Sequence, residues 1–182
     1  MGEVVVSLSE LEQRLVAPFY LPMMAAGAAG LEPELRDELV QVSATVTLEE
    51  VRQLLRSGWM WRPLVMGTWF ALAVPGDEIK DDVVTAMASS AGGLTAPPLA
   101  AVSALLAGAE AIGAMQTCAE WIGDPARRDG SYEVVAAAIA HVGGTPPVVA
   151  SPSAVSDFRE LYQRADELRH AFRAARGGVA LP

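Results

Sequence analysis

The residues of this chain that could act chemically are few and lie far apart in the sequence. Its 182 residues include one cysteine, Cys118, and two histidines, His141 and His170. Cys118 falls on an apolar helical stretch with Met115 and Trp121, where burial would raise the pKa of the thiol, so we interpret it as structural. His141 ends an alanine-rich stretch and His170 lies on a polar one, so both fit capping or surface roles. A dyad of Cys118 and His141 is the one catalytic pair left open.

The sequence carries no recognisable metal or phosphate site. Four acidic residues cluster in one segment: Asp77, Glu78, Asp81 and Asp82. Their spacing fits the start of a helix, and no calcium-loop pattern follows them. One cysteine and two histidines give no zinc pattern, and the glycine pairs 92–93 and 143–144 lack the lysine of a phosphate loop. We therefore predict no catalytic residues, no metal and no cofactor.

The segment 57–70 holds three of the four tryptophans and a single arginine, Arg62. A guanidinium cannot be neutralised, so an inward Arg62 needs a carboxylate, a carbonyl or a tryptophan face as its partner. One interpretation is a buried or half-buried guanidinium that links adjacent helices through a carboxylate. The other places Arg62 with Trp59 at an exposed helix end as a binding site, because both residue types are frequent interface anchors.

A second candidate site is apolar. Methionine and tryptophan side chains fall on helices that we expect to pack together, and a pocket could lie between them near Met24, Met66, Trp69 and Met87. Such side chains fill cores more often than they line pockets. The pocket is therefore the alternative to a protein-binding surface.

The elements that position these residues are predicted to be helices. Hydrophobic residues make up 52% of the chain but aromatic residues only 6%, and alanine is frequent throughout, which favours packed helices over a sheet. The length suits a single domain over 1–182. We divide it into an N-terminal helix broken by prolines (1–30), stacked helix pairs (31–152), a long C-terminal helix (153–176) and a frayed tail (177–182).

Local signals place the helix starts and suggest how the helices stack. The expected caps and first-turn residues are Ser7 or Ser9, Pro33, Thr47, Asp77 and Thr95. From residue 32 onward each pair of helices covers about forty residues, the size of an antiparallel helical repeat. We predict an all-α fold, an irregular α-solenoid of stacked antiparallel helix pairs anchored by the tryptophan-rich helix, with a compact helical bundle as the alternative.

Three segments carry a family resemblance: Pro18-Phe19-Tyr20, Thr47 to Leu55, and Trp61-Arg62 followed by Trp69-Phe70. They resemble a family of small bacterial proteins of unknown function whose helices are similar to HEAT repeats. The turn from Leu94 to Pro98 departs from that family, which tends to carry a tyrosine and glycines there. The resemblance implies a fold of stacked helix pairs and supplies no activity.

Charge and segment composition narrow the function classes. The net charge of −9 repels phosphate backbones, and the arginines of the last helix alternate with acidic residues, so we expect no nucleic-acid partner. We expect no signal peptide and no membrane span, and a single cysteine fits a reducing cytoplasm.

We predict a cytoplasmic, non-enzymatic protein-interaction module. A small acidic antidote of the immunity type, or a regulator that covers a basic partner, would have this size and charge. The alternative is a small-molecule binding or tailoring protein with an apolar pocket between helices. A homodimer through the apolar stripe of the C-terminal helix is compatible with either function.

Overall fold

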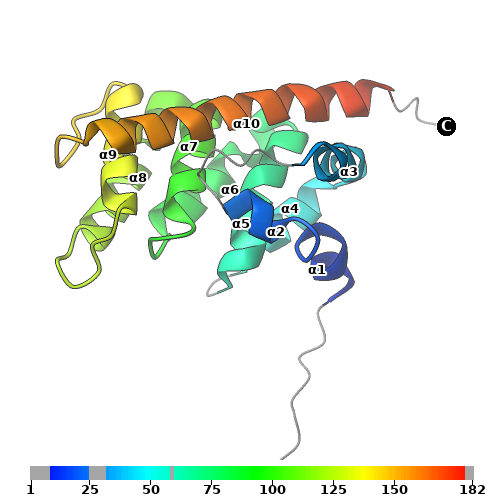
Figure 1. The fold of residues 1–182 in the computed structure, drawn as a ribbon, viewed down its shortest axis with the longest axis horizontal. Helices are drawn as coiled ribbons and strands as arrows, with labels where there is room; N and C mark the ends of the chain where they lie inside the picture. The colour runs from blue at the N-terminus through cyan, green and yellow to red at the C-terminus, as the bar shows by residue number, and fades with distance from the viewer. Residues whose placement is uncertain (1–8, 25–31, 58–59, 179–182) are drawn as a thin grey trace, which may run out of the picture.

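The computed structural model describes residues 9–24, 32–57 and 60–178. Within these ranges the protein is all-α, with no strand, and the helices pack directly against one another (Figure 1). The predicted fold class is therefore confirmed. The helices are α1 (Glu10–Leu15), α2 (Tyr20–Met24), α3 (Pro33–Ser43), α4 (Leu48–Leu55), α5 (Trp61–Phe70), α6 (Gly76–Ala88), α7 (Ala96–Ala107), α8 (Ile112–Ile122), α9 (Ser131–His141) and α10 (Pro152–Gly178), with 3-10 turns η1 (Ala71–Ala73) and η2 (Gly108–Ala111).

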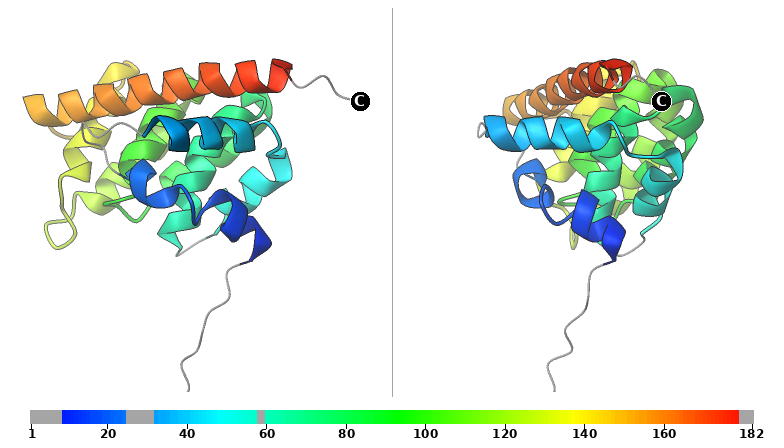
Figure 2. Two further views of the ribbon diagram at one scale, coloured as in Figure 1. Left: turned by 45° about the vertical axis from the view of Figure 1, so that its right-hand side comes forward. Right: turned by 90° about the vertical axis from the view of Figure 1, so that its right-hand side faces the viewer.

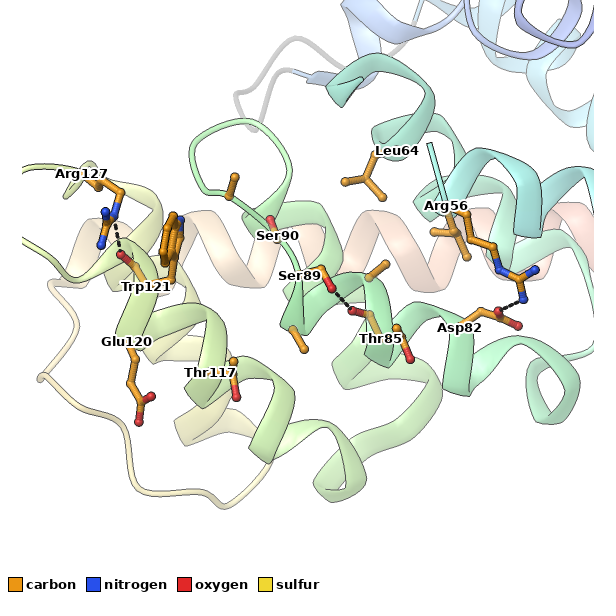
Figure 3. Close-up of a pocket in the computed structure, with 14 residues that line it drawn as sticks. Arg56, Leu64, Asp82, Thr85, Ser89, Ser90, Thr117, Glu120, Trp121 and Arg127 are labelled. Carbon is orange, nitrogen blue, oxygen red and sulfur yellow. Dashed lines mark hydrogen bonds and ion pairs between the residues drawn. The ribbon is translucent and has the colours of Figure 1, made fainter. Parts of the chain in front are cut away.

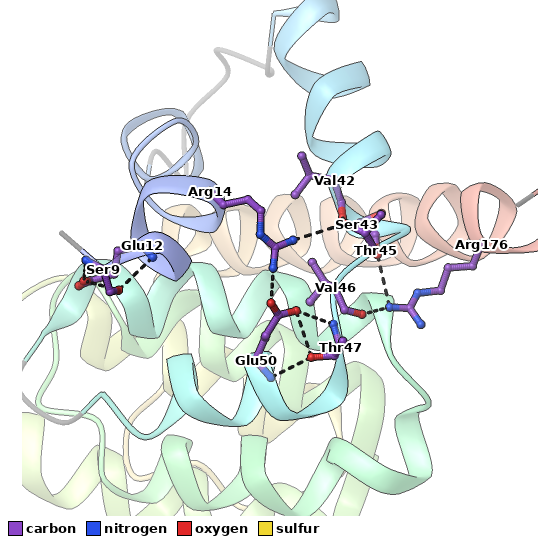
Figure 4. A network of polar contacts seen from close by, with 10 residues as sticks. All are labelled: Ser9, Glu12, Arg14, Val42, Ser43, Thr45, Val46, Thr47, Glu50 and Arg176. Carbon is purple, nitrogen blue, oxygen red and sulfur yellow. Dashed lines mark hydrogen bonds and ion pairs between the residues drawn. The ribbon is translucent and has the colours of Figure 1, made fainter. Parts of the chain in front are cut away.

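Two of the predicted helix starts form complete capping boxes. The Ser9 hydroxyl accepts the N–H of Glu12 at 3.3 Å, and the Glu12 carboxylate accepts the N–H of Ser9 at 2.9 Å. Thr47 and Glu50 make the same exchange at the start of α4, at 3.3 Å and 2.8 Å. Both caps are thus confirmed, while Ser7 lies outside the described residues. Figure 4 shows both boxes and the ion pair of Glu50 with Arg14, which ties α1 to α4.

Two other predicted caps are wrong. The helix α6 begins one residue before Asp77, and no side chain caps it. Thr95 does precede α7, but its hydroxyl makes no capping hydrogen bond. The second and third residues of that helix are Pro97 and Pro98, which have no N–H to donate. The Thr95 hydroxyl instead bonds with the hydroxyl of Ser90 at 2.7 Å.

Six central helices form two rows. Successive helices pack as the pairs α4–α5, α6–α7 and α8–α9. The helices α4, α6 and α8 contact one another in turn, as do α5, α7 and α9. We call the first set the outer row and the second the inner row. This order agrees with stacked helix pairs, and the curled solenoid stays a prediction.

The inner row is enclosed on its other side by the long helix α10. Every residue of α5 from Pro63 to Phe70 is buried, and so are most residues of α7 and α9. The helix α10 runs across this row and contacts α9, α7, η1 and α3 (Figures 1 and 2). Its apolar stripe, including Phe158, Leu168 and Phe172, is buried inside the protein. A homodimer through this stripe would first have to expose these residues.

One described stretch, Ala96–Ile122, is long and apolar enough to cross a membrane, and half of its apolar window is buried. The fold divides this stretch into α7, η2 and α8. Gly108 at the division has φ of +55°, which L-residues rarely adopt. The two halves then pack in different rows, so both act here as core helices.

Candidate functional site

An open groove of about 990 Å³ follows α6 on the outer row, with α4 and α8 on either side (Figure 3). The C-terminal parts of all three helices line it, together with Leu64 from the start of α5 and Arg127 from the loop after α8. The three C-terminal ends meet there because successive outer-row helices pack side by side. The groove therefore spans three helix pairs.

Trp121 is the exposed aromatic side chain of this groove, with 51% of its surface accessible. Arg127 stacks on it, with the guanidinium carbon 3.9 Å from the ring centroid. The Arg127 Nε–H donates to the carbonyl of Trp121 at 3.1 Å, and its Nη2 pairs with Asp124 at 3.0 Å. These contacts hold the indole in place and balance the charge of Arg127.

Asp82 lies at the α4 end of the groove. Its carboxylate pairs with Arg52 Nε and with Arg56 Nη2, each at 2.9 Å. Burial by itself would raise the pKa of Asp82, but the hydrogen bonds from Arg52 and Arg56 lower that pKa below its ordinary value. Asp82 therefore stays ionised at neutral pH and links α6 to α4.

Four hydroxyl side chains line the groove, of which Ser90 bonds with the Thr95 hydroxyl; the other three are Thr85 on α6, Ser89 at the C-cap of α6 and Thr117 on α8. Thr85, Ser89 and Thr117 each donate their hydrogen to the carbonyl four residues earlier, at 2.8, 3.0 and 3.0 Å. A hydroxyl whose hydrogen is used in this way can still accept. These side chains therefore offer acceptors to anything that enters the groove.

Glu120 is an exposed carboxylate on α8 that also lines the groove. It belongs to none of the ion pairs found in the described ranges. It lies two residues before the end of α8, where the helix dipole disfavours a negative charge. Glu120 is thus a charge without an ion-pair partner in the described ranges, and its side chain points away from that of Trp121 (Figure 3).

The predicted chemical residues do not come together. Cys118 is fully buried, with its Sγ 3.7 Å from the Ser90 carbonyl oxygen, and burial raises the pKa of the thiol to about 12. His141 lies against α10, with ring centroids 5.2 Å from Phe158 and 4.7 Å from Tyr162. The structural interpretation of Cys118 is confirmed, and the Cys118–His141 dyad does not form.

Arg62 is exposed, so its interpretation as a buried guanidinium paired with a carboxylate is wrong. Its guanidinium carbon lies 4.5 Å from the ring centroid of Trp61 and 5.1 Å from that of Tyr20. An aromatic face was one of the partners that the sequence allowed. Trp59 lies outside the described residues, so a joint anchor of Trp59 and Arg62 stays a prediction.

The residues that were predicted to line an apolar pocket lie in the core instead. Met66, Trp69 and Met87 are fully buried in the core, and they line neither the groove nor a smaller pocket between α1 and α4. The side chain of Met24 lies outside the described part of the structure. Over the described ranges, no group of three or more histidine, cysteine or acidic side chains could hold a metal ion.

Sequence reasoning missed the groove and its aromatic residue, because Trp121 was expected on the apolar side of its helix. The residues of α8 that are buried are Met115, Cys118, Ala119 and Ile122. These positions follow the three- and four-residue spacing of one helix face, and Trp121 falls outside that set. The spacing of the apolar residues in α8 could therefore have predicted that this indole is exposed.

Comparison of the chain with protein family models, curated proteins and solved structures found no match in any of the three. The groove offers recognition chemistry in the form of an aromatic face, acceptor oxygens and balanced ion pairs. The hydroxyls of Thr85, Ser89 and Thr117 donate to helix carbonyls and that of Ser90 bonds with the Thr95 hydroxyl, so none of the four is arranged as an activated nucleophile.

Proposed function

We propose that this protein is an interaction module that binds a protein partner through the groove of the outer row. The observation that carries the proposal is the half-exposed Trp121 held in place by Arg127. Tryptophan and arginine are the residues that most often dominate the energy of protein interfaces. An indole that is already fixed also loses little conformational entropy when a partner covers it.

The overall charge supports a basic partner. A net charge of −9 attracts a basic protein at long range and speeds the encounter. A cytoplasmic acidic antidote or regulator that covers such a protein is the class of function that we propose. The family resemblance fits this class, because stacked helix pairs build extended binding surfaces.

Site-specific photo-crosslinking tests the proposal. Benzoylphenylalanine at Thr117, inside the groove, should give a covalent protein adduct in the native cells, and adding Trp121→Ala should abolish it. The matched control places the same group at Arg159, an exposed position on α10, which covers the inner row on the side away from the groove. The same adducts from both positions, or none from Thr117, would contradict a binding site in the groove.

A small-molecule site in the same groove is the second candidate. Its volume of about 990 Å³ lies at the upper end of ordinary ligand pockets, which measure about 300 to 1,000 Å³. A ligand well above its dissociation constant would raise the melting temperature by mass action. Thermal-shift screening of metabolites against the native protein and Trp121→Ala separates the two candidates, because only a groove ligand gives a shift that the variant loses.

A further inference from the structure

We infer, on the basis of the proposed function, that the protein partner docks a short, basic, amphipathic helix across the groove, with its apolar side against Trp121 and Leu64. These two side chains line the groove from different sides, Trp121 from α8 and Leu64 from the start of α5 (Figure 3). Ser89 and Ser90, at the end of α6, lie between them. The groove thus has an aromatic side, an aliphatic side and small residues in between.

The polar groups that line the groove leave its centre to an apolar side chain. The four hydroxyls of the lining are already hydrogen-bonded within the protein. Both lining arginines, Arg56 and Arg127, are paired with carboxylates. Glu120 has no ion-pair partner in the described ranges, but it points away from Trp121. The half-exposed indole of Trp121 is the large surface that a partner would remove from water.

The backbone of the groove favours a helical occupant over an extended one. Throughout the described ranges the protein has no strand, so no sheet edge is present there to pair with an extended chain. An extended segment on an apolar surface would leave its own N–H and C=O groups without partners, whereas a helix pairs them internally. The occupant would therefore present apolar residues three and four apart to the groove.

The spacing of the outer row sets the length of that helix. The helix α6 contacts both α4 and α8. Because the axes of packed helices lie about 8 to 10 Å apart, the groove extends up to about 20 Å from α8 to α4. At about 1.5 Å per residue, a helix of about 11 to 13 residues covers this length. Apolar residues near its two ends would then contact Trp121 and Leu64.

Charge complementarity makes the other side of this helix basic. Two arginines line the groove, Arg56 and Arg127. Two carboxylates of the lining, Asp82 and Glu120, balance them. The long-range field at the groove is therefore set by the net charge of −9, which attracts lysine and arginine on the exposed side of a docked helix.

Two blocked peptides of fourteen residues, with identical numbers of leucine, lysine and alanine, provide the probe. One places leucine at three- and four-residue steps, and the other spreads the leucines around the helix. Binding is followed through the indole N–H resonance of Trp121, identified by its loss in Trp121→Phe, and conformation through the ¹³Cα shifts of labelled peptide. The amphipathic peptide should saturate, become helical when bound and bind about tenfold more tightly than the reordered peptide. Equal affinities, an extended bound peptide or no saturable binding would overturn the inference.

A pair of matched variants tests whether the helix lies in the groove. Ala91 lines the groove at an exposed position, so Ala91→Lys adds bulk and a repelling charge and should weaken the amphipathic peptide about tenfold or more. Ala174→Lys makes the same change at an exposed position on α10 and should leave the affinity unchanged. Equal weakening by both variants would overturn a local site.

A third peptide tests the charge of the partner. It carries glutamate in place of lysine and should bind at least about threefold more weakly at low salt, because the net charge of the protein repels it. Equal or tighter binding of this peptide would overturn the basic chemistry of the helix.

The crosslinking experiment separates this inference from the proposed function. A Thr117 adduct, combined with peptides whose affinities do not differ, would overturn the docked helix while the protein-binding groove stands. Selective binding of the amphipathic peptide without any adduct in the native cells would remove the protein-binding function and leave the preference of the groove for a helix.

Discussion

The inner and outer rows are built from helices of similar length but bury their residues differently. The inner-row helix α5 is buried from Pro63 to Phe70, whereas α4 of the outer row buries only Val51, Leu54 and Leu55. The difference arises because α10 covers the inner row and leaves the groove side of the outer row uncovered. The inner row is therefore mostly enclosed, whereas the outer row contributes one side to the core and keeps the other side, with the groove, exposed.

Replacing one tryptophan in each row tests the difference in burial between the rows, and the largest change in unfolding free energy is expected here. Trp69→Ala opens a cavity in the fully buried core and should cost about 3 to 5 kcal/mol of unfolding free energy. Trp121→Ala, at a half-exposed site, should cost less than about 1 kcal/mol. Denaturant midpoints check that the first variant loses more unfolding free energy than the second.

Trp69→Phe should cost less than Trp69→Ala, because the phenyl ring fills most of the cavity and the Trp69 Nε1 has no hydrogen-bond partner in the described structure that would be lost. Equal costs for the two alanine variants would contradict the division between rows.

A pair of glycines tests how closely the rows approach each other. A Cβ at Gly67 of α5 would lie 2.8 Å from the Leu54 Cβ and 2.9 Å from the Leu55 nitrogen. Gly67→Ala should therefore force α4 and α5 apart and cost about 1 to 3 kcal/mol. A Cβ at Gly113 of α8 meets nothing within 4 Å, so Gly113→Ala should stabilise by about 0.5 to 1 kcal/mol. Thermal unfolding of both variants gives the signs, and a stabilising Gly67→Ala would disprove the close contact.

The end of α10 offers a way to loosen its contact with the rest of the protein. Arg176 Nη2 donates to the carbonyl of Val46 and, at 3.4 Å, to that of Ser43, in the turn between α3 and α4 (Figure 4). Arg176→Ala should cost about 1 to 2 kcal/mol, because these bonds come from a charged donor. Hydrogen exchange should rise at the C-terminal end of α10, while the exposed Arg173→Ala should have little effect. Identical exchange in both variants would show that the contact is dispensable.

The smallest effect is expected at Asp82, which joins two outer-row helices. Its pKa is lower in the folded state than the unfolded value of about 3.9, so its stabilising effect is present above that pH. The effect is lost as the pH falls through the folded pKa. Asp82→Asn should remove about 0.5 to 1 kcal/mol at neutral pH and flatten the acid limb of the stability curve. Asp81→Asn, at an exposed neighbouring position, should leave the acid-side dependence of the unfolding free energy on pH as it is in the native protein. If both variants lost this pH dependence equally, the role of the Asp82 ion pairs would be contradicted.

Local signals in the sequence determined the helical class and several helix starts correctly. Ser9 and Thr47 could be identified as caps because a capping box involves residues only three apart. Pro33, expected in a first turn, does begin α3, and the long C-terminal helix also agrees with the structure. The Thr95 cap failed because of its own neighbours, two prolines without an N–H. That error could have been avoided from the sequence.

The groove and its residues were decided by the tertiary structure alone. Which side of a helix stays exposed depends on which distant segment covers the other side, and here α10 covers the inner row. The partners of Asp82 and of Arg176 lie 26 or more residues away along the chain. The sequence by itself therefore determined the helical class and the starts of several helices, such as α1 and α4, whose capping residues are local. Only packing between distant segments decided that three outer-row helices meet at a groove and that Trp121 lies in it, because both depend on contacts that no local spacing encodes.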